Sequence, residues 1–201
     1  MAARKPYHHG NLRTALLNAS LALIRKEGLH GFTLREVARR AEVSHNAPYR
    51  HFLDKDDLLA AIAEDGFNRL TAKIREAASK GDSHLERLRM AGIAYVQFGL
   101  DQPEEFNVMF SIELDPDLHP SARAAADASF ESLVSLVVDC QRAGLLPRYE
   151  PRTAARIAWA QMHGITELAM RRQFAFKTRQ EIVDFTAVAT AALQTGIAGA
   201  A

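Results

Sequence analysis

The polar residues between positions 44 and 55 are of the types that read and hold double-stranded DNA. Asn46 carries an amide that can pair with the edge of adenine, and His45 can donate to a guanine acceptor. Side chains suited to phosphate oxygens follow, namely Tyr49, Arg50, His51 and Lys55. This combination predicts a surface that binds a nucleic acid.

To reach base edges, these groups must lie on a helix that can enter the major groove. The sequence indicates two short helices joined by a tight turn. Thr33 and Glu36 have the spacing of a capping box at the start of the first, and Ser44 is a good cap for a second helix through about Phe52. Helix-turn-helix geometry also occurs in proteins that never meet DNA, so the spacing alone leaves open a helical hairpin buried in a bundle.

Charge is divided unevenly along the 201 residues. The first 55 carry ten Lys or Arg and four Asp or Glu, whereas the remainder carries 15 and 20. A basic first quarter on an acidic remainder suggests a small module for a polyanion joined to a body with another task. The single cysteine excludes an intrachain disulfide, and the first twelve residues hold no apolar run. We therefore expect a cytoplasmic protein with no membrane partner.

Helical periodicity dominates the chain, without the alternation typical of strands. We expect an all-α protein of about nine helices, the first ending at a left-handed Gly28. Residues 1–55 would form the DNA-binding helix-turn-helix domain and residues 81–201 a second helical domain. A fourth helix over residues 55–80, capped by Asp54, would connect the two. Later helices should begin near residues 84, 103, 121, 151 and 178.

Two stretches are more specific than a bare helix-turn-helix. The first is the run Phe32-Thr-Leu-Arg-Glu-Val-Ala-Arg-Arg-Ala-Glu-Val-Ser44, followed by Ala47-Pro-Tyr-Arg-His-Phe-Leu-Asp-Lys-Asp-Asp-Leu-Leu59. It closely resembles the N-terminal DNA-binding domain of the TetR/AcrR family of bacterial transcriptional regulators. This resemblance covers about residues 9–70. The second stretch is Trp159-Ala-Gln-Met-His163-Gly164, which is similar to the Trp-His-Gly (WHG) signature of one class of TetR C-terminal domain.

The resemblance implies a ligand-responsive regulator, most often a repressor, that binds a palindromic operator as a homodimer. The positions that match DNA-contacting ones are Thr33, Arg35, Ser44, His45, Asn46, Tyr49 and His51, with Lys55 matching a phosphate-contacting lysine. Glu42 departs from the family, standing in the turn where many members have glycine. Pro48 replaces an ordinary helix former, which would delay the third helix beyond Ser44. The N-terminus forms a basic arm of Arg4, Lys5, Tyr7, His8 and His9. This arm either touches DNA or is a terminus without a role in binding.

In the second domain, the resemblance implies a pocket for a small-molecule effector. Its candidate lining residues are Phe98, Phe106, Met109, Phe110, Phe130, Trp159, Met162 and His163. Aromatic and methionine side chains on helices also form plain cores. His163 is the sharpest polar candidate, because a buried imidazole needs a partner and could offer a ligand one hydrogen bond. The alternative is a histidine paired within the core.

The resemblance also implies that the last two helices of each subunit form a dimer bundle. The final helix offers, at helical spacing, Phe185, Val188, Ala192 and Thr195. This stripe could instead pack inside its own subunit. Two other functions stay open: a helical protein-interaction module, and an enzyme that uses His163 with Glu167 one helical turn away. The sequence has no phosphate-binding glycine loop and no Cys/His metal spacing, so we expect no catalysis, no cofactor and no metal ion.

Overall fold

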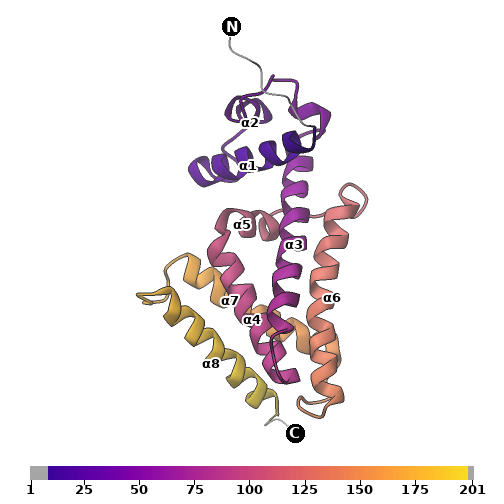
Figure 1. Cartoon of the computed structure of the whole chain (residues 1–201), viewed down its shortest axis with the longest axis vertical. Coiled ribbons are helices and arrows are strands. Elements are labelled where there is room, and N and C mark those ends of the chain that lie inside the picture. Colours follow the sequence, from indigo (N-terminus) through magenta and orange to yellow (C-terminus); the bar gives the residue numbers. More distant parts are fainter. Residues whose placement is uncertain (1–8, 199–201) are drawn as a thin grey trace.

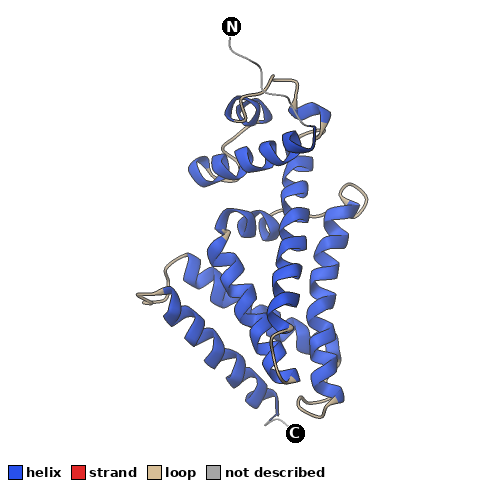
Figure 2. Ribbon diagram, in the orientation of Figure 1, coloured by secondary structure: helices blue, strands red, loops and turns tan. Residues whose placement is uncertain are grey.

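The computed structural model describes residues 9–198, and this range contains eight α-helices, one short 3-10 helix and no strand (Figure 2). The helices are α1 (His9–Glu27), α2 (Leu34–Arg40), η1 (Pro48–Arg50), α3 (Lys55–Ala78), α4 (His84–Asp101), α5 (Pro103–Ser111), α6 (Pro120–Arg142), α7 (Pro151–Met170) and α8 (Arg179–Ala198). The all-α class predicted from the sequence is confirmed. None of the helices in the described range combines the length and the apolar character that crossing a bilayer requires.

The helices form a small unit and a larger body that share α3 (Figure 1). The small unit consists of α1, α2, η1 and the first turns of α3. From there α3 runs into the body, where it packs against α4, α5 and α6. Helix α7 packs against α4 and α6, and α8 packs on α4 and α7. The short helix α5 lies between the small unit and the rest of the body (Figure 1).

Local sequence explains where the first helices begin and end. The Thr33 hydroxyl accepts from the Glu36 N–H at 3.3 Å, and the Glu36 carboxylate accepts from the Thr33 N–H at 2.8 Å. Asp54 caps α3 by accepting from the Asp57 N–H at 2.9 Å. Gly28 ends α1 with φ of 80°. These contacts confirm the predicted capping box, the predicted cap of the connecting helix and the predicted end of the first helix.

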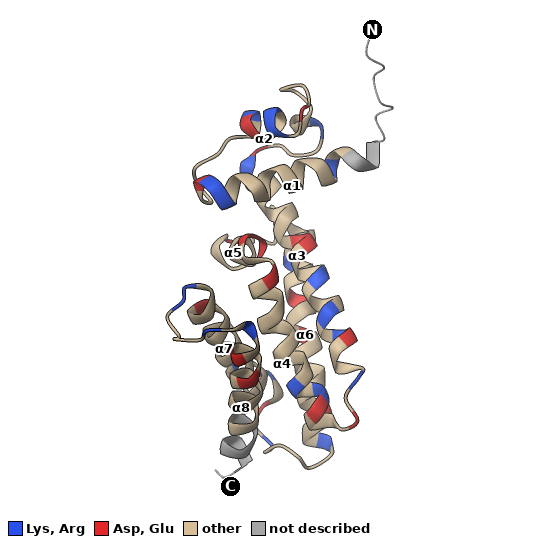
Figure 3. Cartoon of the chain, turned by 60° about the vertical axis from the view of Figure 1, so that its left-hand side comes forward, with Lys and Arg blue, Asp and Glu red and all other residues tan. Residues whose placement is uncertain are grey.

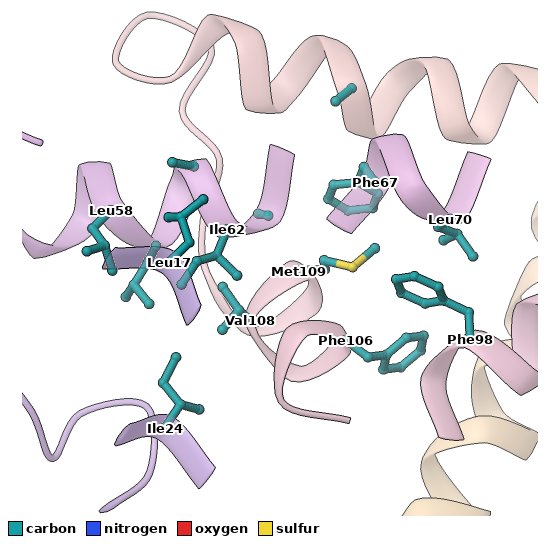
Figure 4. Packing of buried hydrophobic residues seen from close by; sticks show 14 of the residues in the cluster. Leu17, Ile24, Leu58, Ile62, Phe67, Leu70, Phe98, Phe106, Val108 and Met109 are labelled. Carbon is teal, nitrogen blue, oxygen red and sulfur yellow. The ribbon is translucent and has the colours of Figure 1, made fainter. Parts of the chain in front are cut away.

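One apolar core runs from the small unit into the body (Figure 4). Ile24 of α1, Ile62 of α3 and Val108 of α5 are all buried in it. The cluster continues into the body with Phe67 and Leu70 of α3, Phe98 of α4, and Phe106 and Met109 of α5. Each fully buried side chain of this size contributes about 1.5–3 kcal/mol. The small unit is therefore fixed to the body by packing, and α5 takes part in both.

Candidate DNA-binding surface and effector cavity

The segment expected to form the third helix is helical only at η1. Pro48 occupies its first position, where the missing N–H is tolerated, and the proline ring would clash with a helical carbonyl four residues earlier, at Ser44. The His51 and Phe52 N–H groups donate to the Pro48 carbonyl at 2.9 and 3.0 Å. A helix beginning at Ser44 is therefore the wrong prediction, and the delayed start that Pro48 suggested is confirmed.

The turn before this segment is closed by Glu42 in a left-handed conformation, with φ of 55°. The Glu42 N–H donates to the Arg39 carbonyl at 3.2 Å, and the Val43 N–H donates to the Ala38 carbonyl at 3.0 Å. This pair of bonds is the Schellman motif, whose left-handed position favours glycine. Glu42 thus keeps the turn that a glycine would form, but its Cβ makes that backbone conformation unfavourable.

We expect Glu42→Gly to raise the free energy of unfolding by about 1 kcal/mol, because glycine removes the steric penalty and loses only part of that gain to chain entropy. Urea denaturation measures the change. Arg172→Gly is a matched control, since Arg172 is the other non-glycine residue of the described range with positive φ, at 54°, and should gain a similar amount. Glu42→Gln removes only the charge and should change little; a gain in this variant equal to that of Glu42→Gly would assign the effect to charge.

The predicted DNA-contacting residues gather on the outer surface of the small unit. The exposed members are Thr33, Arg35, Ser44, His45, Asn46, Tyr49 and Arg50, and the half-buried ones are His51 and Lys55. Within the described residues, no side-chain hydrogen bond or ion pair holds His45, Asn46 or Arg50. Lys and Arg mark both α1 and α2 in this unit (Figure 3). The segment is therefore presented to a partner, whereas the side chains of the basic arm lie outside the described residues.

Lys55 is held differently from its neighbours on this surface. Its ammonium nitrogen lies 4.3 Å from the ring centroid of Phe32, a cation–π contact. Burial lowers the pKa of Lys55, and the carboxylates of Asp56 and Glu36 oppose that shift. Lys55 is half-buried, so its contact with a phosphate stays a prediction.

A cavity of about 510 Å³ lies in the body between α3, α4, α5, α6 and α7. Five of the predicted pocket residues line it: Met109, Phe110, Phe130, Trp159 and Met162. Phe98 and Phe106 do not line it and belong to the core, at 1% and 0% exposure. Sequence reasoning missed Tyr95 and the arginines of the lining, Arg123, Arg152 and Arg156. The helical face that each of these residues occupies depends on packing with distant helices.

Tyr95 joins the cavity wall to His163. The Trp159 indole N–H donates to the Tyr95 hydroxyl oxygen at 3.0 Å, and this oxygen lies 2.9 Å from His163 Nδ1. Since the indole can only donate, the phenol proton is free to be donated to Nδ1 in the tautomer of His163 that carries its own proton on Nε2. Burial lowers the pKa of His163 and raises that of Tyr95, so both groups are held neutral. His163 does not line the cavity and is a histidine paired within the body.

Two family models match the chain. The tetracyclin repressor-like C-terminal domain matches residues 88–193, and the model of bacterial regulatory proteins of the tetR family matches residues 16–62. The chain belongs to the TetR family. The Trp-His-Gly motif falls within the first of these matches.

Relatives of this TetR-family chain include two mycobacterial regulators. The transcriptional activator FasR of Mycolicibacterium smegmatis is 25% identical over 127 residues, which are 62% of this chain and 58% of FasR. The repressor KstR of the same organism is 37% identical over 76 residues, 38% of this chain and 37% of KstR. The chain thus matches less than two thirds of either relative's length. A solved protein of unknown function from Rhodococcus sp. RHA1 is 34% identical with a TM-score of 0.84, covering 97% of this chain and 100% of that one.

In the TetR-family chain, α5 contacts both the cavity and the small unit. Met109 and Phe110 line the cavity. At the start of the same helix, Glu104 accepts two hydrogen bonds from Arg25 of α1, at 2.7 and 3.0 Å. Glu105, the next residue, forms an ion pair with Arg69 of α3. One short helix therefore connects the cavity wall to α1 of the small unit and to α3.

The outer face of α7 and α8 is apolar and exposed. Ile157 and Leu168 of α7 are 44% and 42% exposed. Gly164 lies between them on the same face, and a Cβ at this position would meet no atom of the chain within 4 Å. Of the predicted dimer stripe, Phe185, Val188 and Ala192 are exposed, and the side chain of Thr195 lies outside the described residues. This face is the TetR-family chain's candidate dimer surface.

Proposed function

We propose that this protein is a ligand-responsive transcriptional repressor of the bacterial cytoplasm, which binds a palindromic DNA operator as a homodimer. The observation that carries the proposal is the exposed segment around Asn46, where groups suited to base edges and to phosphates lie together on a basic helix-turn-helix unit. Two relatives are named a repressor and an activator. The partners we propose are operator DNA, a second copy of the chain and a small-molecule effector.

Two-fold symmetry would place two such segments one DNA turn apart, about 34–36 Å. The outer face of α7 and α8 supports this pairing because it leaves large apolar side chains exposed, among them Ile157 at 44%, Leu168 at 42% and Val188 at 66%. Glycine in an exposed helix costs about 1 kcal/mol relative to alanine. Packing within the subunit gives no reason for a glycine at position 164, whereas close approach of a second helix does.

The proposed response to an effector runs through α5. An occupant of the cavity would press on Met109 and Phe110, and a shift of α5 would be passed through Glu104 to Arg25 of α1 and through Glu105 to Arg69 of α3. The two DNA-binding segments of the dimer would then no longer match the spacing of the operator half-sites. The effector's preference for one arrangement over the other sets the size of this effect.

Operator binding is tested by selection from a randomised duplex library, followed by gel shift with the selected sequence. Arg50→Gln should weaken binding uniformly across sequences and flatten the slope of log affinity against log salt by about 0.9, because one phosphate contact is lost. Asn46→Ala should instead relax the preference at one base position, by about 1–3 kcal/mol. Arg148→Gln is the control, since Arg148 is exposed in the loop between α6 and α7.

Failure of the library to yield any retained sequence at low salt would favour a protein-interaction module over a regulator.

The enzymatic alternative gains no support from the geometry. No hydrogen bond joins Glu167 to His163; the Glu167 carboxylate accepts from Arg171 Nε at 2.9 Å, and the His163 ring is engaged with Tyr95.

A further inference from the structure

The cavity has an apolar wall and a charged opening. Its wall is formed by apolar and aromatic side chains from α3, α4, α5, α6 and α7, among them Leu70, Ala91, Phe110, Leu133 and Trp159. Its charged lining residues, Arg123 and Asp127 of α6 with Arg152 and Arg156 of α7, are all exposed to solvent. The cavity therefore opens between α6 and α7, and three of the four charged groups at the opening are cations.

Two of these cations already have acidic partners. Arg123 Nε lies 3.1 Å from both carboxylate oxygens of Asp127. Arg152 forms an ion pair with Glu131 and lies over the ring of Phe130, at 5.3 Å from its centroid. Both guanidinium groups are thus engaged at the rim by the chain itself.

Arg156 has no ion pair and no side-chain hydrogen bond within the described residues. Glu150 acts on it only as a nearby charge, because both Glu150 oxygens cap α7 by accepting the N–H groups of Arg152 and Thr153, at 2.9 and 2.6 Å. Arg156 lies one helical turn before Trp159, and both line the cavity. A guanidinium without an ion-pair partner therefore stands at the opening of an apolar chamber, with the charge of Glu150 nearby.

From this arrangement we infer that the effector is an amphipathic anion, with an apolar body in the chamber and one acidic group bound by Arg156; the inference rests on the proposed effector role of the cavity. The apolar wall favours an aliphatic or aromatic body, because burying apolar surface is favourable. The planar guanidinium matches a carboxylate or a phosphate through two parallel hydrogen bonds. A cationic amphiphile would meet three arginines at the opening, and a neutral one would leave Arg156 without a counterion.

The only tryptophan of the sequence, Trp159, lies in the cavity wall, so intrinsic fluorescence reports binding. Dodecanoate, dodecanol and dodecyltrimethylammonium share one chain length and differ in charge. Titrated below their micelle concentrations, dodecanoate should bind about tenfold more tightly than dodecanol, the ratio expected for one charge-assisted contact. Calorimetric titration of the same compounds gives affinities that do not depend on Trp159.

Arg156→Met keeps the aliphatic stem and removes the charge. It should bring the affinity for dodecanoate down to that for dodecanol and leave the dodecanol affinity unchanged. Arg148→Met is the matched control, an exposed arginine outside the cavity lining, and should leave the preference intact. Equal binding of acid and alcohol by the native chain, preference for the cation, binding of none of the three, or equal loss of both affinities in Arg156→Met would overturn the inference.

The same preparations are assayed for operator binding without amphiphile. Operator binding without a preference for the acid overturns the effector assignment and leaves the proposed regulator intact. Preference for the acid in a protein that retains no DNA supports an amphipathic anion as the ligand of the cavity and counts against the regulator, and so against an effector role of that ligand. The two failures are therefore distinguishable.

Discussion

Replacing Gly164 with leucine should convert the dimer to a monomer and weaken operator binding at least a hundredfold. In the isolated subunit a Cβ at position 164 meets no other atom within 4 Å, and Ile157 and Leu168 on the same face are exposed, so we expect the fold to tolerate a leucine there. In a pair of helices whose axes are about 8–10 Å apart, it would enter the space of the partner helix. Loss of the second half-site removes an avidity factor of about 10²–10⁴. Sedimentation gives the mass and gel shift gives the affinity.

Ala124→Leu adds a similar side chain to an exposed position of α6 and should change neither the mass nor the affinity. Gly164→Ala separates helix propensity from the interface. In a chain without a partner at this face, it should raise stability by about 1 kcal/mol; in the dimer, it should give less than this or a loss. A Gly164→Leu protein that stays dimeric and binds the operator as the native chain does would show that the interface lies elsewhere.

The sequence could predict the helix-turn-helix unit well because the signals that define it are local. The Thr33–Glu36 capping box, the Asp54 cap and the Gly28 end each depend on residues within four positions of one another. Pro48 and Glu42 were recognisable as departures for the same reason. The sequence alone did not predict which backbone conformation the chain would adopt at these two positions. Pro48 reduced the third helix to a single 3-10 turn, whereas Glu42 adopted the backbone that glycine would have taken.

The cavity was less predictable, since its lining depends on how each helix is rotated against its neighbours. Phe106 and Phe110 lie one helical turn apart on α5, yet Phe106 is sealed in the core and Phe110 lines the cavity. Tyr95 acquires its role from partners more than sixty residues away, Trp159 and His163. No spacing rule within one helix distinguishes such residues. An exposed arginine such as Arg156 gives no sequence signal of a binding role, because that role depends on the cavity beside it in the fold.

Arg69→Met should lower the free energy of unfolding by about 3 kcal/mol at pH 7, because it leaves a buried carboxylate without its counterion. Glu105 is only 2% exposed, and its Oε2 is buried without a hydrogen-bond partner. Its other oxygen is paired with Arg69. Even with that partner, burial raises the pKa of Glu105 above its ordinary value, opposed by Arg69 and assisted by Asp65. Chemical denaturation of the variant and the native chain gives the difference.

The sign of the pH dependence follows from the raised pKa of Glu105. Below the ordinary pKa of a glutamate, the carboxyl is neutral in the folded and unfolded chains alike, and Arg69→Met should cost little there. As pH rises through the folded-state pKa, the unfolded chain releases this proton more readily than the folded one, and stability is lost. Removing Arg69 raises the folded-state pKa further. The loss in Arg69→Met should therefore grow from pH 5 to pH 8.

Arg69→Met combined with Glu105→Gln distinguishes charge from packing. The amide keeps the shape of Glu105 and cannot ionise, so the double variant should recover most of the lost stability at pH 7 and lose the added pH dependence. A deficit in Arg69→Met that is the same at pH 5 and pH 8, and that persists in the double variant, would assign the effect to the packing of the Arg69 stem. Recovery would show that the loss in Arg69→Met comes from a buried Glu105 carboxylate left without its counterion at the start of α5, and not from lost packing of Arg69.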